Sequence, residues 1–165
     1  MNKAEKERRF LELTDGYKEV IAKVCYLYTS PTVSFDDLYQ ETLINIWQGM
    51  DSFRGDAKVS TWIYRTAINT CITWLRRNSR HNRGTVPIED LVIDPADPAD
   101  PSAAEDTRQL YMLISRLDPL EKAVITLWLD EKSYDEIAAV TGLSRSNVAV
   151  KVHRIKDKLS RLAAS

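Results

Sequence analysis

Three prolines recur at every third position of the stretch DPADPADP, residues 94–101. Each proline removes a backbone donor and restricts the residue before it, so this stretch cannot be the interior of a helix. The surrounding segment, 84–107, holds seven acidic residues and no basic one. As an extended chain it could reach up to about 75 Å. The 165-residue chain is therefore predicted to form two small domains, 1–83 and 108–165, joined by an acidic, proline-rich linker, 84–107.

Charge is distributed unevenly along the chain, although the net charge is only −1. Residues 76–83 carry four arginines, and residues 143–165 carry six lysines or arginines against a single aspartate. A near-neutral protein with this pattern can present local surfaces that bind phosphate. The acidic linker is either a simple solvated spacer or a competitor with DNA for the two basic segments.

Several classes of protein are disfavoured by what the sequence lacks. No apolar run approaches the roughly 20 residues of a membrane span, and no apolar segment follows the charged opening MNKAEKERR. We therefore expect a cytoplasmic protein without membrane insertion of its own. Cys25 and Cys71 lack a CxxC spacing and are predicted to be buried free thiols. His81 and His153, the only histidines, lie in or beside basic helices, so we expect no enzymatic activity, metal or cofactor.

The N-terminal domain is predicted to be a bundle of three helices. Helical spacing of apolar residues predicts one long helix over 3–29, which Ser30-Pro31 ends. A second helix follows the cap Ser34 and ends at Gly49, and a third runs from about Ser60 to Arg80. The second helix is expected to bury Tyr39, Leu43, Ile46 and Met50, and the third to bury Tyr64, Ile68, Cys71 and Leu75. The opposite face of the third helix is polar and basic: Arg65, Asn69, Thr73, Arg76 and Arg80.

The C-terminal domain is predicted to contain four helices over 108–162. Asp118, followed by Pro119 and Glu121, indicates the start of one helix, and Ser133 with Glu136 indicates the next. The all-α class therefore applies to the whole chain.

The segment SYDEIAAVTGLSRSNVAVKVHR, residues 133–154, has the pattern of a helix-turn-helix. Ala138 permits close helix crossing, Gly142 suits the turn, and Ser144 caps the second helix. The buried stripe of that helix is Val148, Val152, Ile155, Leu159 and Leu162. Beside it runs a mostly basic strip of Asn147, Lys151, Arg154, Lys158 and Arg161. Such residues can reach phosphates and base edges in the major groove, so we expect DNA binding, although Lys158 and Arg161 could equally serve the helix dipole.

The N-terminal domain combines arginines with aromatic residues, which suits unstacked bases. Phe53 lies in a loop with Arg54, and Trp62 and Trp74 follow at a spacing that also fits a role in the core. Here the chain resembles the extracytoplasmic-function sigma factors of bacterial RNA polymerase, over about residues 10–162. The segments that carry the resemblance are DLYQE at 37–41, DSFRGD at 51–56, STWIYR at 60–65, AINT at 67–70, SYDEIA at 133–138 and GLS at 142–144.

The resemblance implies a two-domain initiation factor whose partners are core RNA polymerase, promoter DNA and an anti-sigma factor, and which is a monomer when free. The implied polymerase-binding residues are Asp37, Leu38, Gln40, Glu41 and Asn45. Those implied in recognition and melting of the −10 element are Phe53, Arg54, Gly55, Asp56, Lys58, Thr61, Arg65, Asn69, Arg76, Arg77 and Arg80. Those implied in −35 recognition are Arg145, Ser146, Asn147, Val150, Lys151 and Arg154.

The chain departs from the family pattern at the recognition helix. The family commonly has Gly-Thr-Val-Lys-Ser-Arg where this chain has Ser146-Asn-Val-Ala-Val-Lys151. The preferred −35 sequence therefore cannot be carried over. Two alternatives remain: a helical regulator that binds duplex DNA without polymerase, and an enzyme such as a recombinase with an appended helix-turn-helix.

Overall fold

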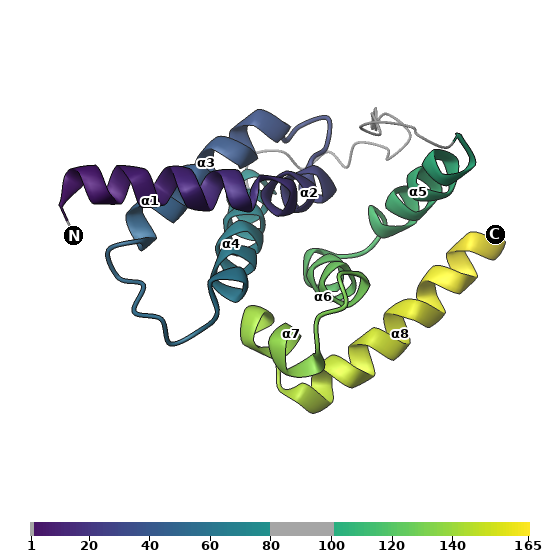
Figure 1. Ribbon diagram of the computed structural model, residues 1–165. Helices are drawn as coiled ribbons and strands as arrows, with labels where there is room; N and C mark the ends of the chain where they lie inside the picture. Colours follow the sequence, from purple (N-terminus) through teal and green to yellow (C-terminus); the bar gives the residue numbers. More distant parts are fainter. Residues whose placement is uncertain (1, 80–100) are drawn as a thin grey trace. The chain divides into compact units, whose positions relative to one another are not determined.

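The computed structural model describes residues 2–79 and 101–165, and in these residues the chain forms eight α-helices and no β-strand (Figure 1). The predicted all-α fold class is confirmed. Contacts between residues divide the chain into two compact units, Met1–Arg83 and Gly84–Ser165. Each unit is a small helical bundle with a core of its own.

The first unit contains α1 (Lys3–Gly16), α2 (Lys18–Tyr28), α3 (Phe35–Gly49) and α4 (Val59–Ser79). The prediction of one helix over 3–29 is wrong, because Tyr17 leaves the helical region, with φ −114° and ψ 16°. Figure 1 shows the axis changing direction at this point. The turn lets α2 enter the core, where it buries five residues, whereas α1 buries only Leu13.

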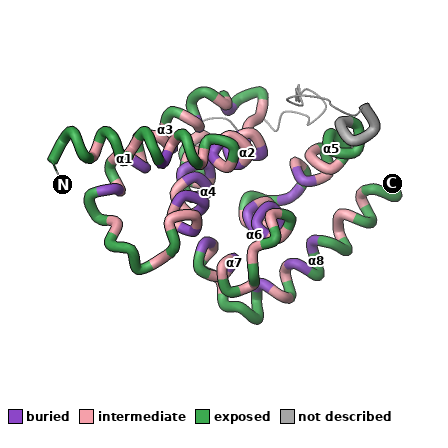
Figure 2. Tube along the Cα trace, in the orientation of Figure 1, coloured by how far each residue is buried: buried purple, intermediate pink, exposed green. Residues whose placement is uncertain are grey.

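The core of the first unit lies where α2 and α3 pack against α4 (Figure 2). Its fully buried side chains include Ile21, Leu38, Ile46, Ile63 and Cys71. Burial of each large aliphatic side chain contributes about 1.5–3 kcal/mol. The stripe predicted for α3 is partly wrong: Leu38 and Thr42 are buried with Ile46 and Met50, whereas Tyr39 and Leu43 are only half-buried.

Side-chain contacts hold α1 against α3. The ring of Phe10 meets Trp47 edge to face at 5.3 Å between centroids. The Lys6 ammonium lies 4.2 Å from the centre of the Trp47 ring and 2.8 Å from a carboxylate oxygen of Asp51. Trp47 is therefore a packing residue of the α1–α3 contact.

The second unit contains α5 (Pro101–Ile114), α6 (Pro119–Leu129), α7 (Tyr134–Thr141) and α8 (Arg145–Ala164). Helix α5 begins at Pro101, within the segment 84–107 that was predicted to be linker. Pro101 stands at the first helical position, where a missing N–H costs nothing. The remainder of the predicted linker, 84–100, lies outside the described residues.

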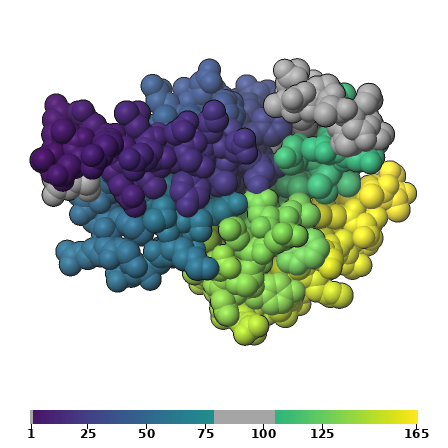
Figure 3. All heavy atoms as spheres, in the orientation of Figure 1, coloured from purple at the N-terminus to yellow at the C-terminus, as the bar shows by residue number. Residues whose placement is uncertain are grey.

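The start of α6 follows the predicted capping box. The Glu121 amide donates to the Asp118 carboxylate at 2.8 Å, and the Asp118 amide donates to the Glu121 carboxylate at 3.0 Å. Helix α6 is the buried centre of the unit, with Val124, Ile125 and Leu127 at most 1% exposed. Helix α8 packs on α5, α6 and α7 and lies at the surface of its unit, in yellow in Figure 3.

Candidate nucleic-acid interface

The turn between α7 and α8 has the geometry that the helix-turn-helix pattern predicts. Gly142 ends α7 in the left-handed conformation, with φ 80°, and its amide donates to the carbonyl of Ala138. A side chain at this position would be strained, so the turn requires glycine or a close substitute. Ser144 then caps α8 by accepting a hydrogen bond of 3.2 Å from the Asn147 amide.

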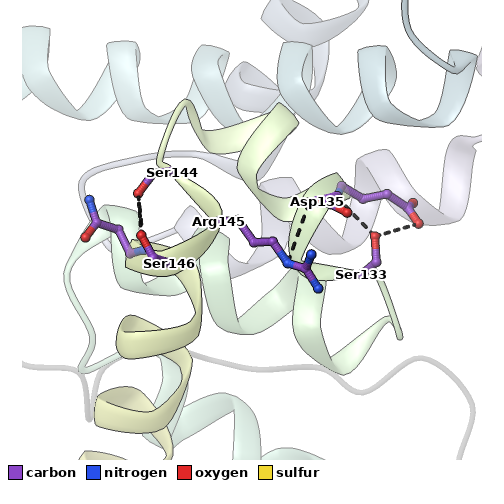
Figure 4. A network of polar contacts seen from close by, with 7 residues as sticks. Ser133, Asp135, Ser144, Arg145 and Ser146 are labelled. Atoms are coloured by element: carbon purple, nitrogen blue, oxygen red, sulfur yellow. Dashed lines mark hydrogen bonds and ion pairs between the residues drawn. The ribbon is translucent and has the colours of Figure 1, made fainter.

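Polar contacts around this turn fix the start of α8 (Figure 4). The Ser133 hydroxyl accepts from the Glu136 amide at 3.1 Å, which caps α7 as predicted. Across the turn, Arg145 lies 3.7 Å from the carboxylate of Asp135, and both side chains are mostly exposed. The hydroxyls of Ser144 and Ser146 are 3.3 Å apart. The first turn of α8 is thus capped and keeps its polar side chains at the surface.

The outward side of α8 is accessible. The helix buries Val148, Val152 and Ile155, as the sequence predicted, and Leu159 and Leu162 are half-buried. Five of the six residues implied in −35 recognition are exposed: Arg145, Ser146, Asn147, Val150 and Arg154. The sixth, Lys151, is half-buried. Lys158 belongs to the fold instead, since its ammonium lies 3.1 Å from the Glu121 carboxylate of α6.

In the first unit, α4 presents a polar and basic side. Asn69, Thr73, Arg76 and Arg77 are exposed and Arg65 is half-buried. Arg80, predicted to lie on the same side, is outside the described residues. The described part of this surface combines three arginines with groups that can contact phosphates or base edges.

A pocket of about 250 Å³ lies between α3 and α4. It is lined by Glu41, Asn45, Thr66, Asn69, Thr70, Thr73, Trp74 and Arg77. The Asn45 amide donates a 2.8 Å hydrogen bond to the Thr70 hydroxyl and so ties the two helices together. The resemblance to sigma factors implied Glu41 and Asn45 in polymerase binding, and Asn69 and Arg77 in DNA binding. The structure brings all four to one place.

The loop between α3 and α4 carries Phe53, whose ring stacks on Trp62 with centroids 4.8 Å apart and planes 24° apart. Packing on Trp62 is therefore a larger part of the role of Phe53 than the sequence indicated. Arg54, Gly55, Asp56 and Lys58 are exposed, and Gly55 has a positive φ of 81°. Thr61, which the resemblance implied in −10 recognition, is buried, so its side chain offers little surface for contact with DNA.

A second pocket, of about 260 Å³, opens beside this loop. It is lined by Arg9, Leu13, Met50, Phe53, Gly55, Val59 and Trp62. Arg9 of α1 is a cation that the sequence analysis did not connect with this loop. Only the packing of α1 beside the loop brings it there, so no local signal in the sequence could have shown it.

The exposed side of α3 differs from the predicted one. Asp37 and Gln40 are exposed and Glu41 is half-buried, but Leu38 is fully buried and belongs to the core. Ile44 was missed: it is 43% exposed and follows Gln40 by four residues and Asp37 by seven, so all three lie on one face. An apolar residue at helical spacing within a polar face was the available signal.

The pKa values of Cys25 on α2 and Tyr39 on α3 are shifted by their surroundings. Cys25 and Cys71 are both buried thiols that form no disulfide, as predicted. A hydrogen bond with the Cys71 side chain lowers the pKa of Cys25, and burial acts in the opposite direction. Burial raises the pKa of Tyr39, with a smaller contribution from Cys25. Neither thiol reaches the exposed surfaces described above.

Two features are absent from the described residues. No helix among them is long and apolar enough to cross a membrane. Likewise, residues 2–79 and 101–165 contain no group of three or more histidine, cysteine, aspartate or glutamate side chains that could hold a metal ion.

Two family models match the chain, one on each unit. Residues 13–81 match sigma-70 region 2, and residues 107–159 match sigma-70 region 4. Among curated relatives, the ECF RNA polymerase sigma factor SigG of Mycobacterium tuberculosis is 28% identical over 96% of this chain, which spans 50% of the length of SigG. SigW of Bacillus subtilis is 27% identical, with 92% of this chain and 87% of SigW covered. The sigma-E factor of Escherichia coli is 27% identical, with 93% and 85% covered.

Solved structures show the same fold. RpoE of Bartonella quintana, in complex with the anti-sigma factor NepR, aligns with a TM-score of 0.75 and 21% identity over 96% of both chains. CnrH, in complex with the cytosolic domain of CnrY, aligns with a TM-score of 0.67 and 23% identity over 96% of this chain and 89% of CnrH. A helical region 2 domain joined to a helix-turn-helix region 4 domain defines the sigma-70 class of transcription factors. Within that class, this chain belongs to the extracytoplasmic-function sigma factors.

Proposed function

We propose that this chain binds core RNA polymerase and directs promoter-specific initiation, by recognising −35 and −10 elements and opening the −10 region. The observation that carries the proposal is the presence of an exposed, cationic helix side in each unit, on α4 and on α8. A single-site DNA-binding protein needs only one of them. Two separate sites suit the two separated elements of a promoter.

Polymerase docking would use the exposed face of α3. Asp37 and Gln40 supply charge and hydrogen bonds, and Ile44 supplies an apolar contact one helical turn beyond Gln40. Interfaces of this kind gain most from a central apolar residue that is desolvated within a polar rim. We therefore replace the buried Leu38 by Ile44 in the docking set. Glu41 and Asn45 stand at the edge of this face, toward α4.

Recognition and opening of the −10 element would use the loop after α3 and the polar side of α4. Opening a duplex costs stacking energy, which an aromatic pocket can offset base by base. The stacked pair of Phe53 and Trp62 supplies an aromatic wall, and Asn69 supplies an amide for a base edge. Arg76 and Arg77, together with Arg80, which lies outside the described residues, would hold phosphates on every promoter alike.

Recognition of the −35 element would use the first turns of α8. Its capped start projects Arg145, Ser146 and Asn147, and the next turns project Val150, Lys151 and Arg154. The N-terminal residues of a recognition helix are those that contact base edges in helix-turn-helix proteins. The domain assignment follows: 1–83 for docking and the −10 element, and 108–165 for the −35 element.

The remaining partners follow from this role. A factor that acts on polymerase and promoter DNA would work in the cytoplasm, without catalysis of its own and as a monomer when free. RpoE of Bartonella quintana was solved with the anti-sigma factor NepR, and we propose that an anti-sigma factor also controls this chain.

The direct test adds the purified chain to core polymerase and genomic DNA and maps the transcript starts. We expect a small set of new starts that share −35 and −10 sequences and are absent with core polymerase alone. Tight duplex binding by the chain alone, without any new start, would instead identify a regulator that works without polymerase.

A further inference from the structure

The structure describes every residue of α8. Val150 is the one large apolar side chain that this helix leaves exposed, at 46%. It lies two residues from both Val148 and Val152, which are buried. Two residues correspond to about 200° around a helix, so Val150 points away from the packed side. Packing within this chain therefore does not account for it.

Helix propensity does not account for Val150 either. A β-branched side chain loses rotamer freedom in a helix, and alanine would stabilise an exposed helical position better. Single exposed apolar residues are common on protein surfaces, so exposure alone does not indicate a function for Val150, and its position on the surface has to be considered. Val150 has Ser146, Asn147 and Arg154 as its neighbours at i−4, i−3 and i+4, and all three are exposed and capable of hydrogen bonding. It is an apolar spot inside the surface proposed to read bases.

The major groove offers one apolar group that matches such a spot. Base edges there present donors and acceptors, and thymine adds its 5-methyl group. Valine offers two methyl groups, no hydrogen bond and little rotamer entropy to lose on contact. We propose that Val150 reads the 5-methyl group of a thymine in the −35 element. This inference rests on the proposed function, because it requires α8 to enter the major groove.

The neighbours of Val150 indicate where that thymine stands. Asn147 precedes Val150 by three residues, which is about 4.5 Å along the helix axis. The amide of Asn147 can form two hydrogen bonds with adenine. The base facing Asn147 and the thymine facing Val150 are therefore neighbours within the −35 element. Since this chain departs from the family pattern at both Asn147 and Val150, two adjacent base contacts differ from those of the family.

The test uses deoxyuridine, which differs from thymidine only by the missing methyl group. In duplexes that carry a mapped promoter, each thymine of the −35 element on either strand is replaced singly. Affinity is measured for the complex of the chain with core polymerase. For the wild type we expect about a fourfold loss at one thymine, the value of one buried methyl group. Val150→Ala should show a smaller preference for thymine over uracil than the wild type, because its single methyl group makes a smaller contact with the thymine methyl.

His153→Ala is the matched control, because His153 is an exposed neighbour of Val150 on the same helix. It should keep the wild-type preference for thymine. A wild type indifferent to every replacement, or a Val150→Ala variant with the full wild-type preference for thymine, overturns the inference while the proposed function stands. A wild-type chain that directs no promoter binding by polymerase overturns both.

Discussion

Lys158 of α8 lies 3.1 Å from the carboxylate of Glu121, the same oxygen that accepts the Asp118 amide at the start of α6. One carboxylate thus caps α6 and ties α8 to it. The Glu121 side chain is only 16% exposed, so an ion pair here is screened less than one on the open surface. Part of the basic strip that the sequence predicted on α8 therefore stabilises the domain.

Lys158→Met should destabilise the second unit by about 1 kcal/mol, because Glu121 loses a charged partner while methionine preserves the packing of the stem. Promoter preference should not change. Chemical denaturation measures the first expectation and start-site mapping the second. Arg161→Met is the control, since Arg161 pairs only with Asp157 at 3.7 Å and both are mostly exposed. Equal losses for the two variants would contradict the assignment.

Gly142→Ala should destabilise the second unit by about 1–2 kcal/mol, the cost of a left-handed backbone with a Cβ atom. Nothing lies within 4 Å of a Cβ built at this position, so the cost is conformational and not steric. Asparagine tolerates this conformation better, and Gly142→Asn should lose clearly less. The free energies of unfolding of the two variants test this. An asparagine variant as unstable as the alanine variant would mean that another constraint acts at the turn.

Ile44→Asp should abolish binding to core polymerase, because it removes the apolar residue of the docking face. Asp37→Ala combined with Gln40→Ala should do the same, because it removes polar residues at the rim of that face. The helical circular dichroism of both variants should equal that of the wild type, since Ile44 is 43% exposed. Asp36→Ala controls for the lost negative charge in the first turn of α3, and it should still bind. Co-elution with polymerase on gel filtration reads the result. Retained binding by the first two variants would rule out this face.

Phe53→Ala should slow promoter opening about tenfold, because it removes the aromatic wall that stacks on Trp62 and is offered to an unstacked base. Binding to polymerase should be unaffected. Ser52→Ala is the control in the same loop, where the exposed serine only bonds the Gly49 carbonyl. Permanganate reactivity of −10 thymines over time follows the opening. An unchanged rate would assign Phe53 to packing alone.

Local signals in the sequence predicted much of this structure. Ser34, Asp118, Ser133 and Ser144 all cap helices, because a cap depends on three or four consecutive residues. Gly142 was predicted for the same reason. Start and end points of helices are therefore readable even without knowledge of the tertiary fold.

Several features that depend on packing between distant segments were not predicted correctly. Helix α3 contacts α1, α2 and α4, so apolar residues surround much of it and periodicity alone could not decide between Leu38 and Tyr39. The change of direction at Tyr17 leaves its hydrogen bond to the Leu13 carbonyl intact, at 3.0 Å, and the apolar spacing continues across it. The α3–α4 pocket likewise exists only once these helices pack.

The central claim is that the chain opens promoter DNA only as part of the polymerase complex. The most direct measurement places 2-aminopurine in the −10 element of a mapped linear promoter and follows its fluorescence with the chain alone, core polymerase alone and both together. We predict a rise, from unstacking of the base, only with both. A full rise with the chain alone, or no rise with both while the chain alone binds the duplex tightly, would contradict the account.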